Sequence, residues 1–270
     1  MTEALTLIGF GEAGRTFAVS AGWKNQASVF DSKTDAPSTR DLMLAAFDQA
    51  EIKACDTLAD AMRDAPAVLS LVTADQSLAA AQQTSVHIAS AALYFDMNSV
   101  APDTKRAAAR MIEAAGGHFI DVAIMAPVEP AHMAVPLLLS GSQADKGASV
   151  LRALGFGNVR VVGSDIGRAS SIKMIRSIMV KGQEALTAEM MLAADKAGVT
   201  DDVLASLGDG WVDKASYNLE RMKTHGLRRA AEMEEVAKTL IALGVEPAMT
   251  SGTIMRQREM ALQSGSGEGQ

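Results

Sequence analysis

A glycine-rich segment near the start of the chain, Gly9-x-Gly11-x-x-Gly14, constrains the fold more than any other part of the sequence. It follows a short apolar run at residues 4–9 and precedes helical periodicity at residues 15–21, so the order strand, glycine turn, helix is predicted. Gly9 permits a tight turn, Gly11 lets the backbone approach a pyrophosphate, and Gly14 lets the helix pack on the strand. The segment therefore predicts a dinucleotide-binding loop at a helix N-terminus.

Strands and helices continue to alternate over the first 165 residues. The further strands are predicted at residues 27–31, 52–55, 67–72, 93–97, 118–123, 136–140 and 158–162, and the helices between them at residues 39–50, 56–64, 76–89, 103–115 and 143–154. This alternation is typical of a mostly parallel, doubly wound sheet. We predict an α/β fold with an N-terminal Rossmann-type domain at residues 1–165.

The pattern changes to helix alone after residue 165. Helical periodicity covers residues 168–197, 201–207, 212–224, 227–243 and 247–262. Aromatic residues make up only 4% of the chain, and there are 16 methionines, so small and flexible side chains must pack these helices closely. We predict an all-α C-terminal domain at residues 166–263 and a disordered tail at residues 264–270, which has no apolar side chain to bury.

Charge and cysteine content exclude several classes of protein. The chain has 25 basic and 32 acidic residues, so it lacks the basic character typical of proteins that bind nucleic acids or anionic membranes. Cys55 is the only cysteine, which rules out a disulfide framework, and the histidines do not fall at metal-ligand spacing. Since no run has the length of a membrane span and the first residues do not resemble a signal peptide, we expect a cytoplasmic protein without a metal.

The residue at the end of the second predicted strand bears on the choice of nucleotide. Asp31 is placed to accept hydrogen bonds from the adenosine ribose hydroxyls, and its charge repels a 2′-phosphate. Lys33 follows two residues later and softens that preference. NAD is therefore the expected cofactor, with NADP as the alternative. The cofactor contacts expected here are Gly9, Phe10, Gly11, Glu12, Ala13, Gly14, Asp31 and Ser32.

Three further segments combine with the glycine loop to resemble a known family. Asp96-Met-Asn-Ser-Val-Ala-Pro102 is similar to an Asp-x-Ser-Thr-x-x-Pro segment, and Pro136-Leu-Leu-Leu-Ser-Gly141 resembles a strand that ends in Gly-Gly. Residues 163–173 are similar to the segment that introduces a catalytic lysine on a long interdomain helix. Together they resemble the β-hydroxyacid dehydrogenase and 6-phosphogluconate dehydrogenase superfamily, in the branch whose C-terminal domain has no known function.

The resemblance implies an NAD(P)-dependent oxidoreductase that transfers hydride between nicotinamide and an alcohol or carbonyl substrate. Lys173 is then the general acid and base, a role that fits a lysine whose desolvation lowers its pKa toward neutrality. The resemblance also implies a homodimer through the helical domain. It places Val72, Thr73 and Asn98 beside the nicotinamide. The substrate contacts expected are Ser99, Met125, Ala126, His132, Ser177, Lys181, His225 and Arg228.

Four of the predicted substrate contacts carry an alternative prediction. For Lys181 a solvated surface position is the alternative, and for His132, His225 and Arg228 a surface or capping role is the alternative. The same reasoning predicts that Arg229 is a surface charge of its helix.

Two departures from the family pattern bear on the substrate. Ser177 stands where the family has asparagine, and the loop from Asp121 to Pro127 replaces Asp-x-Pro-Val-Ser-Gly-Gly. The second change removes a hydroxyl, a flexible glycine pair and, at Pro127, a backbone donor, all of which serve to hold a carboxylate. The substrate predicted is therefore larger or less polar than a short 3-hydroxy acid, with Met125 as an adaptable apolar contact.

Two other functions remain open at this point. Imine reductases share the architecture that the resemblance implies, although they usually place a different residue at the position of Lys173. A protein that senses a dinucleotide without turnover would keep the glycine loop and have no need of Lys173. Replacing Lys173 separates these functions from a dehydrogenase.

Overall fold

The computed structural model describes residues 5–24 and 26–265, with side chains to residue 262. The chain divides into two compact units, residues 1–173 and residues 174–270. We call them the sheet unit and the helical unit. The division lies eight residues beyond the predicted boundary, because the first turns of the long helix that joins the units belong to the sheet unit.

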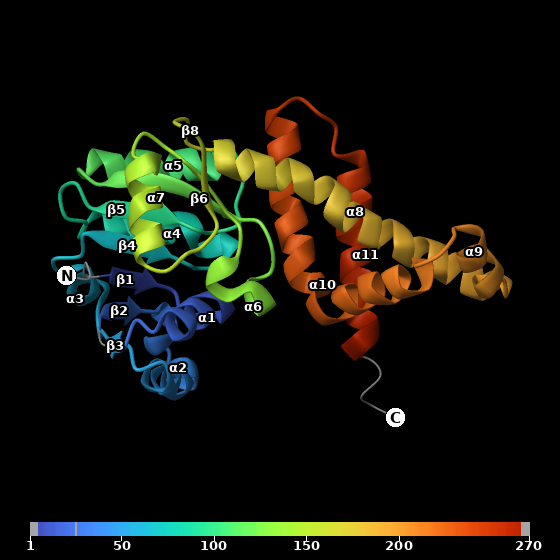
Figure 1. Ribbon diagram of the computed structural model, residues 1–270, viewed down its shortest axis with the longest axis horizontal. Helices are drawn as coiled ribbons and strands as arrows, with labels where there is room; N and C mark the ends of the chain where they lie inside the picture. The colour runs from blue at the N-terminus through green and yellow to red at the C-terminus, as the bar shows by residue number, and fades with distance from the viewer. Residues whose placement is uncertain (1–4, 25, 266–270) are drawn as a thin grey trace. The chain divides into compact units, whose positions relative to one another are not determined.

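The sheet unit contains an eight-stranded sheet with the strand order β3-β2-β1-β4-β5-β6-β7-β8 (Figure 1). The strands are β1 (Leu5–Ile8), β2 (Ala27–Phe30), β3 (Lys53–Ala54), β4 (Ala67–Ser70), β5 (Leu93–Asp96), β6 (His118–Ile124), β7 (Leu137–Ser140) and β8 (Val159–Gly163). Neighbouring strands pair in parallel except β6 and β7. The α/β class and the mostly parallel sheet are confirmed.

Helices cover both faces of this sheet. They are α1 (Glu12–Ala21), α2 (Pro37–Gln49), α3 (Leu58–Met62), α4 (Ser77–Ser85), α5 (Pro102–Ala114), α6 (Val128–Ala131) and α7 (Ala144–Ala153). Alternate strand residues point to opposite faces, so Phe95 of β5 belongs to the buried cluster that includes α1, α2 and α7, while its neighbour Tyr94 belongs to the cluster that includes α3, α4 and α5. The sheet is buried on both sides, which explains its continuous apolar strands.

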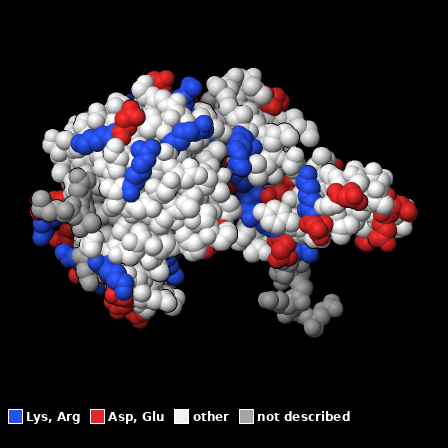
Figure 2. All heavy atoms as spheres, in the orientation of Figure 1, with Lys and Arg blue, Asp and Glu red and all other residues white. Residues whose placement is uncertain are grey.

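The helical unit contains most of α8 (Arg168–Ala197), together with α9 (Thr200–Ser206), α10 (Trp211–Ala242) and α11 (Ala248–Gly265). Its buried clusters contain Met, Ala, Val and Leu but no aromatic side chain. Acidic side chains gather at the end of this unit that carries α9 (Figure 2). Among the described residues, no helix has both the length and the apolar character that a bilayer span needs.

Two expectations for the helical unit need correction. The predicted break between residues 224 and 227 is wrong, because α10 is continuous through Gly226. A Cβ at Gly226 would collide with the carbonyl oxygen of Gln257 in α11 and lie 2.9 Å from the Ala261 Cβ, so this glycine serves close helix packing. Residues 264 and 265 of the predicted tail lie in α11, since one more turn costs an already formed helix little; residues 266–270 lie outside the described residues.

Candidate functional site

The glycine loop joins β1 to α1, and two of its glycines are required by their surroundings. Gly9 has a φ of 88°, and a Cβ there would lie 2.7 Å from the Leu71 carbonyl oxygen. A Cβ on Gly14 would lie 3.0 Å from the Gly9 carbonyl oxygen. A Cβ on Gly11, in contrast, would meet no atom of the described part of the chain within 4 Å. Gly11 is thus the position where the loop leaves room for a ligand.

The first turn of α1 follows this open position. Gly11 is the N-cap residue of α1 and has no side chain that could accept hydrogen bonds from the backbone amides of the first turn. Gly11 and Glu12 are exposed and Ala13 is half-buried, so the positive end of the helix dipole is accessible to an anion. Phe10 is fully buried against Phe47, with ring centroids 5.1 Å apart, and therefore anchors the loop.

Asp31 fixes the glycine loop to the end of β2. The carboxylate is 8% exposed, and both of its oxygens accept backbone hydrogen bonds, Oδ2 from Phe10 N at 2.7 Å and Oδ1 from Lys33 N at 2.9 Å. Ser32 and Lys33 are exposed beside it. Arg40 reaches the same turn, because its Nη1 donates to the Thr34 carbonyl oxygen at 2.8 Å. The sequence predictions did not include Arg40.

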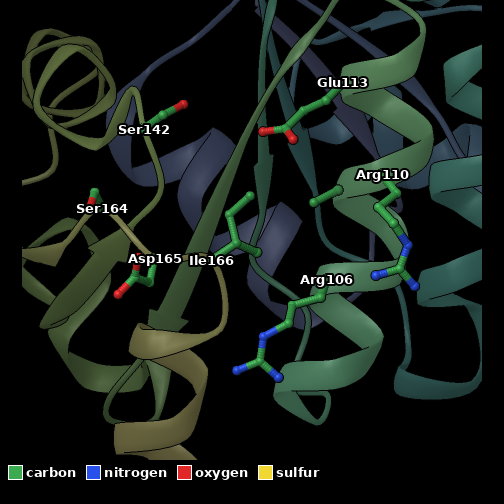
Figure 3. A pocket seen from close by; sticks show the side chains of 8 residues that line it. Arg106, Arg110, Glu113, Ser142, Ser164, Asp165 and Ile166 are labelled. Atoms are coloured by element: carbon green, nitrogen blue, oxygen red, sulfur yellow. The ribbon is translucent and has the colours of Figure 1, made fainter.

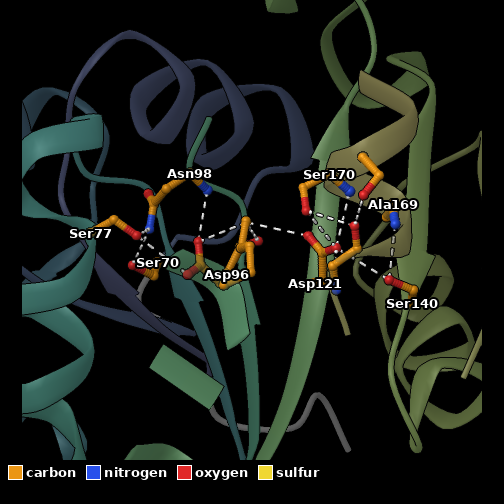
Figure 4. Close-up of polar contacts among 11 residues, drawn as sticks. Ser70, Ser77, Asp96, Asn98, Asp121, Ser140, Ala169 and Ser170 are labelled. Carbon is orange, nitrogen blue, oxygen red and sulfur yellow. Dashed lines mark hydrogen bonds and ion pairs between the residues drawn. The ribbon is translucent and has the colours of Figure 1, made fainter. Parts of the chain in front are cut away.

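The loop after β4 is held by Asn98, which follows β5. Val72 N donates to Asn98 Oδ1 at 2.7 Å, and Asn98 Nδ2 donates to the hydroxyls of Ser70 and Ser77 at 3.0 and 3.3 Å (Figure 4). The structure thus brings Val72 and Asn98 together at the carboxyl ends of two parallel strands, where open α/β sheets bind their ligands.

The outer part of the same loop is exposed. Thr73 is exposed, and hydrogen bonds from the side chains of Thr73 and Gln76 lower the pKa of Asp75. Ser99, which follows Asn98, has a buried hydroxyl oxygen that finds no hydrogen-bond partner among the described residues.

A buried charge cluster lies next to Asn98 and was not predicted. Lys105 of α5 is fully buried, and its Nζ lies 2.9 Å from Asp96 Oδ1 and 3.5 Å from Asp121 Oδ1. Both aspartates are fully buried, and they are register partners in β5 and β6. The sequence contained a signal for this cluster, since Lys105 occupies the apolar stripe of α5 with Pro102 and Ala108.

Asp121 also accepts hydrogen bonds from the start of α8. Its Oδ2 accepts hydrogen bonds from Gly167 N at 3.1 Å, from Ser170 N at 3.0 Å and from Ser170 Oγ at 3.0 Å. Ser140 Oγ accepts from Ala169 N at 3.0 Å and donates to Asp121 Oδ2 at 3.2 Å (Figure 4). A carboxylate at a helix N-terminus is favourable, so Asp121 anchors α8 in the sheet unit.

Lys173 follows Ser170 by one helical turn and is half-buried. Positions three and four residues apart share a helix face, so Ser170, Lys173 and Ser177 form one stripe on α8. The stripe continues into the helical unit, where Lys181 is 6% exposed. Its Nζ lies 2.7 Å from Glu232 Oε2 and donates to Ser177 Oγ at 3.3 Å. The surface alternative for Lys181 is wrong, because the Glu232 carboxylate compensates its buried charge.

A second buried ion pair lies further along the same stripe. Glu184 accepts hydrogen bonds from Arg229 Nε at 2.8 Å and from Gln257 Nε2 at 3.0 Å. Arg229 is 6% exposed. The predicted surface position of Arg229 is therefore wrong, because α10 turns this residue toward the buried Glu184.

The remaining predicted substrate contacts lie in several places. Met125 and Ala126 follow β6 and are half-buried. His132 is close to α1, with its Nδ1 at 2.9 Å from Ser20 Oγ and its Nε2 at 3.2 Å from Glu129 Oε2. These contacts use both ring nitrogens of His132 within the sheet unit. In the helical unit, both His225 and Arg228 are on α10, half-buried and exposed respectively.

A surface pocket of about 520 Å³ lies elsewhere on the sheet unit (Figure 3). Arg106 and Arg110 of α5 line one side, and Ser164 and Asp165 of the loop between β8 and α8 line the other. None of the predicted site residues lines this pocket. It is therefore separate from the glycine loop.

The geometry of β1, the glycine loop and α1 defines a dinucleotide-binding domain, and comparison with known proteins gives its family. Residues 4–163 match the NAD binding domain of 6-phosphogluconate dehydrogenase, and residues 194–260 match a domain of unknown function, DUF1932. The chain belongs to this family of NAD(P)-dependent, hydroxyacid dehydrogenase-like proteins.

Three relatives are similar over nearly the whole chain. A conserved hypothetical protein from Sinorhizobium meliloti has 36% identity and a TM-score of 0.78, over 100% of this chain and 91% of its own. A conserved protein of unknown function, described as structurally similar to 3-hydroxyacid dehydrogenases, has 30% identity and a TM-score of 0.74, over 97% and 99%. An uncharacterized 28.5 kDa protein of Methanothermus fervidus has 27% identity over 91% and 94%.

More distant structures share the fold alone. They include a 3-hydroxyisobutyrate dehydrogenase of Mycobacterium tuberculosis, at 16% identity with a TM-score of 0.77, and a reductive aminase of Aspergillus terreus, at 18% with a TM-score of 0.60.

Proposed function

We propose that this protein transfers hydride between a nicotinamide cofactor and an alcohol or carbonyl substrate, with Lys173 as general acid and base. One observation carries the proposal. The glycine loop, the Asn98–Val72 contact and Lys173 all belong to the sheet unit. Asp96, Lys105 and Asp121 connect the Asn98 segment to Ser170, one helical turn before Lys173.

The residues of the glycine loop fit a bound dinucleotide. The open position at Gly11 and the accessible start of α1 would hold the pyrophosphate, with Asp31 near the adenosine ribose. Asn98 holds the Val72 loop, where the nicotinamide would lie. When bound in its reduced form, the nicotinamide supplies a hydride.

Lys173 supplies the proton that must accompany the hydride. In the reducing direction its ammonium gives a proton to the carbonyl oxygen, which becomes the alcohol hydroxyl, and the neutral amine then recovers a proton from water. In the oxidising direction the neutral amine takes the hydroxyl proton. A half-buried lysine can reach a bound substrate and still exchange its proton with water.

The surroundings of Asp31 support both nicotinamide nucleotides. Its carboxylate lies where the ribose hydroxyls of NAD would donate hydrogen bonds. Each carboxylate oxygen accepts one backbone hydrogen bond and keeps a lone pair for a second. The exposed Lys33 and Arg40 at the same turn would attract the 2′-phosphate of NADP. We therefore propose NAD as the cofactor with NADP as an accepted alternative.

The substrate that we propose is larger or less polar than a short 3-hydroxy acid. The loop after β6 carries the half-buried Met125 and Ala126 where the family has residues that hold a carboxylate. Rates measured with 3-hydroxyisobutyrate-type acids and with bulky or aromatic alcohols test this part. A clear preference for the small acids contradicts it.

We also propose a homodimer that forms through the helical unit. Several large apolar side chains of this unit are more than 60% exposed, and a dimer would remove them from water. They include Met179, Leu186, Leu227, Met249 and Met255. Analytical ultracentrifugation of the purified chain tests this proposal, and a single monomeric species at micromolar concentration contradicts it.

Oxidation of NADH and NADPH, measured with a panel of carbonyl compounds and preformed imines, tests the reaction. We expect turnover with carbonyl compounds and a loss of at least about a hundredfold in kcat for Lys173→Ala, with the nucleotide Kd changed less than threefold. Lys196→Ala is the matched control, because Lys196 is an exposed lysine of the same helix.

Other outcomes of this experiment point to other functions. Equal rates in wild type and Lys173→Ala contradict the assigned role of Lys173. Turnover confined to the imines indicates an imine reductase, a function suggested by the shared fold of a reductive aminase. Nucleotide binding without any turnover indicates a sensing protein.

A further inference from the structure

We propose that Lys105 is a positioning residue that fixes the first turn of α8, and with it Lys173, relative to the Asn98 loop. This inference rests on the proposed function for the role of Lys173. It depends on the buried contacts of Lys105 with Asp96 and Asp121, all within the sheet unit.

On one side, the Lys105 ammonium binds Asp96, in the segment that carries Asn98. Its Nζ donates to the Asp96 carbonyl oxygen at 2.6 Å and to Asp96 Oδ1 at 2.9 Å. The same Oδ1 accepts a hydrogen bond from Asn98 N at 3.0 Å. A single carboxylate oxygen thus links Lys105 to the residue that orients the Val72 loop.

On the other side, the ammonium reaches the anchor of α8. Lys105 Nζ lies 3.5 Å from Asp121 Oδ1, an oxygen for which no hydrogen-bond partner is present among the described side chains. The other oxygen, Asp121 Oδ2, is saturated by Gly167, Ser170 and Ser140. Lys105 is therefore the cation that compensates the carboxylate on which α8 begins.

Full burial makes this arrangement specific. Lys105, Asp96 and Asp121 are each 0% exposed, and a buried charge is retained at such a cost only when its partners hold it. A surface lysine would not need two carboxylates on adjacent strands. Because Lys173 lies one turn beyond Ser170, a shift of the first turn of α8 moves Lys173 with it.

A double variant separates positioning from simple charge balance. Lys105→Met alone leaves two buried carboxylates without a cation, so a failure of that variant to fold would report on charge alone. Lys105→Met with Asp96→Asn removes one charge of each sign, and the Asn side-chain oxygen can still accept from Asn98 N. Lys146→Met, on an exposed lysine of α7, is the matched control.

Amide hydrogen exchange of the full chain gives the readout. The amides of Gly167 and Ser170 donate to Asp121, so they report on the anchor without being next to the substituted residues. We expect the double variant to exchange these two amides at least tenfold faster, with α7 changed less than twofold and kcat reduced at least tenfold at a nucleotide Kd within threefold of wild type. Ser170→Ala should accelerate the same amides.

Two results overturn the inference. Unchanged exchange at Gly167 and Ser170 shows that Lys105 does not hold α8, and an equal acceleration throughout the sheet unit shows a role in stability alone. The exchange experiment needs no substrate and no nucleotide. A failure of the proposed function, seen as no turnover in the wild type, is therefore distinguishable from a failure of this inference.

Discussion

The two units of this chain have different kinds of core. The sheet unit contains nine of the eleven aromatic residues, and Phe17, Phe156 and Trp23 pack ring against ring. The buried clusters of the helical unit contain no aromatic side chain, and buried ion pairs such as Glu184–Arg229 run through its interior. The few aromatic residues of the chain are therefore concentrated in its sheet unit.

This difference follows from geometry. A two-faced sheet leaves wide layers between strands and helices that large rings fill, whereas long helices approach one another closely only where small side chains meet. Gly226 marks such a close approach. Substitutions that leave a cavity should therefore destabilise the sheet unit most. In the helical unit, the largest losses should come from substitutions that overpack two helices or leave a buried charge uncompensated.

The largest loss is expected in the aromatic core of the sheet unit. Phe156 is 1% exposed, and its ring centroid lies 5.0 Å from that of Phe17. Phe156→Ala should lower the free energy of unfolding by about 4 kcal/mol, since it removes apolar contacts and leaves a cavity. Urea denaturation followed by circular dichroism measures this. Leu42→Ala, at a residue that is 75% exposed, is the control and should change stability by less than about 0.5 kcal/mol.

A somewhat smaller loss is expected from the ion pair of the helical unit. Arg229→Met leaves the buried Glu184 carboxylate with Gln257 and the more distant Arg221 as partners, and should cost about 3 kcal/mol. Adding Glu184→Leu should restore most of that loss, because an apolar pair needs no compensation. If Arg229→Met unfolds at the same urea concentration as the wild type, the ion pair does not stabilise this core.

Two glycines of the helical unit should respond in opposite directions to the same substitution. Gly226→Ala forces a Cβ into the Gln257 carbonyl oxygen and should cost about 2 kcal/mol. Gly252→Ala places its Cβ in open space on α11 and should stabilise the chain by up to about 1 kcal/mol through helix propensity. Thermal denaturation of both variants measures the difference. Equal shifts of the two would mean that α10 and α11 do not pack closely at Gly226.

The smallest effect concerns the nucleotide and should be confined to the sheet unit. Lys33→Ala removes an exposed charge beside Asp31, so it should weaken NADPH binding about threefold to tenfold and leave NADH binding within twofold. Titration of nucleotide fluorescence measures both affinities. Lys53→Ala, at an exposed lysine of β3, is the control. Equal effects on the NADPH and NADH affinities would show that Lys33 does not interact with the 2′-phosphate.

Local patterns in the sequence predicted the sheet unit well. The glycine loop, the strands and most helices depend on neighbouring residues, so periodicity alone places them. The antiparallel direction of β7 is not visible in such a pattern, because it depends on how the chain returns after β6. The resemblance to a family added the placement of Asn98, which the structure brings next to Val72.

Long-range contacts explain what the sequence predictions missed. Gly226 looked like a helix break because its partner, Gln257, lies 31 residues away on α11. A surface position was predicted for Arg229 and was the alternative for Lys181, because the carboxylates that compensate their buried charges lie on other helices. These carboxylates are Glu184 for Arg229 and Glu232 for Lys181. Lys105 carried a local signal, its place in the apolar stripe of α5, but its partners are again distant in sequence.

Nucleotide binding to a Gly11→Val variant tests the central claim most directly. A Cβ at Gly11 meets no atom of the described residues within 4 Å beyond its chain neighbours, so the fold should be kept, with a thermal midpoint close to that of the wild type. The same side chain would fill the space that the pyrophosphate needs, so we expect the affinity for both NADH and NADPH to fall at least about a hundredfold. Unchanged nucleotide affinity in a folded Gly11→Val variant would contradict the account.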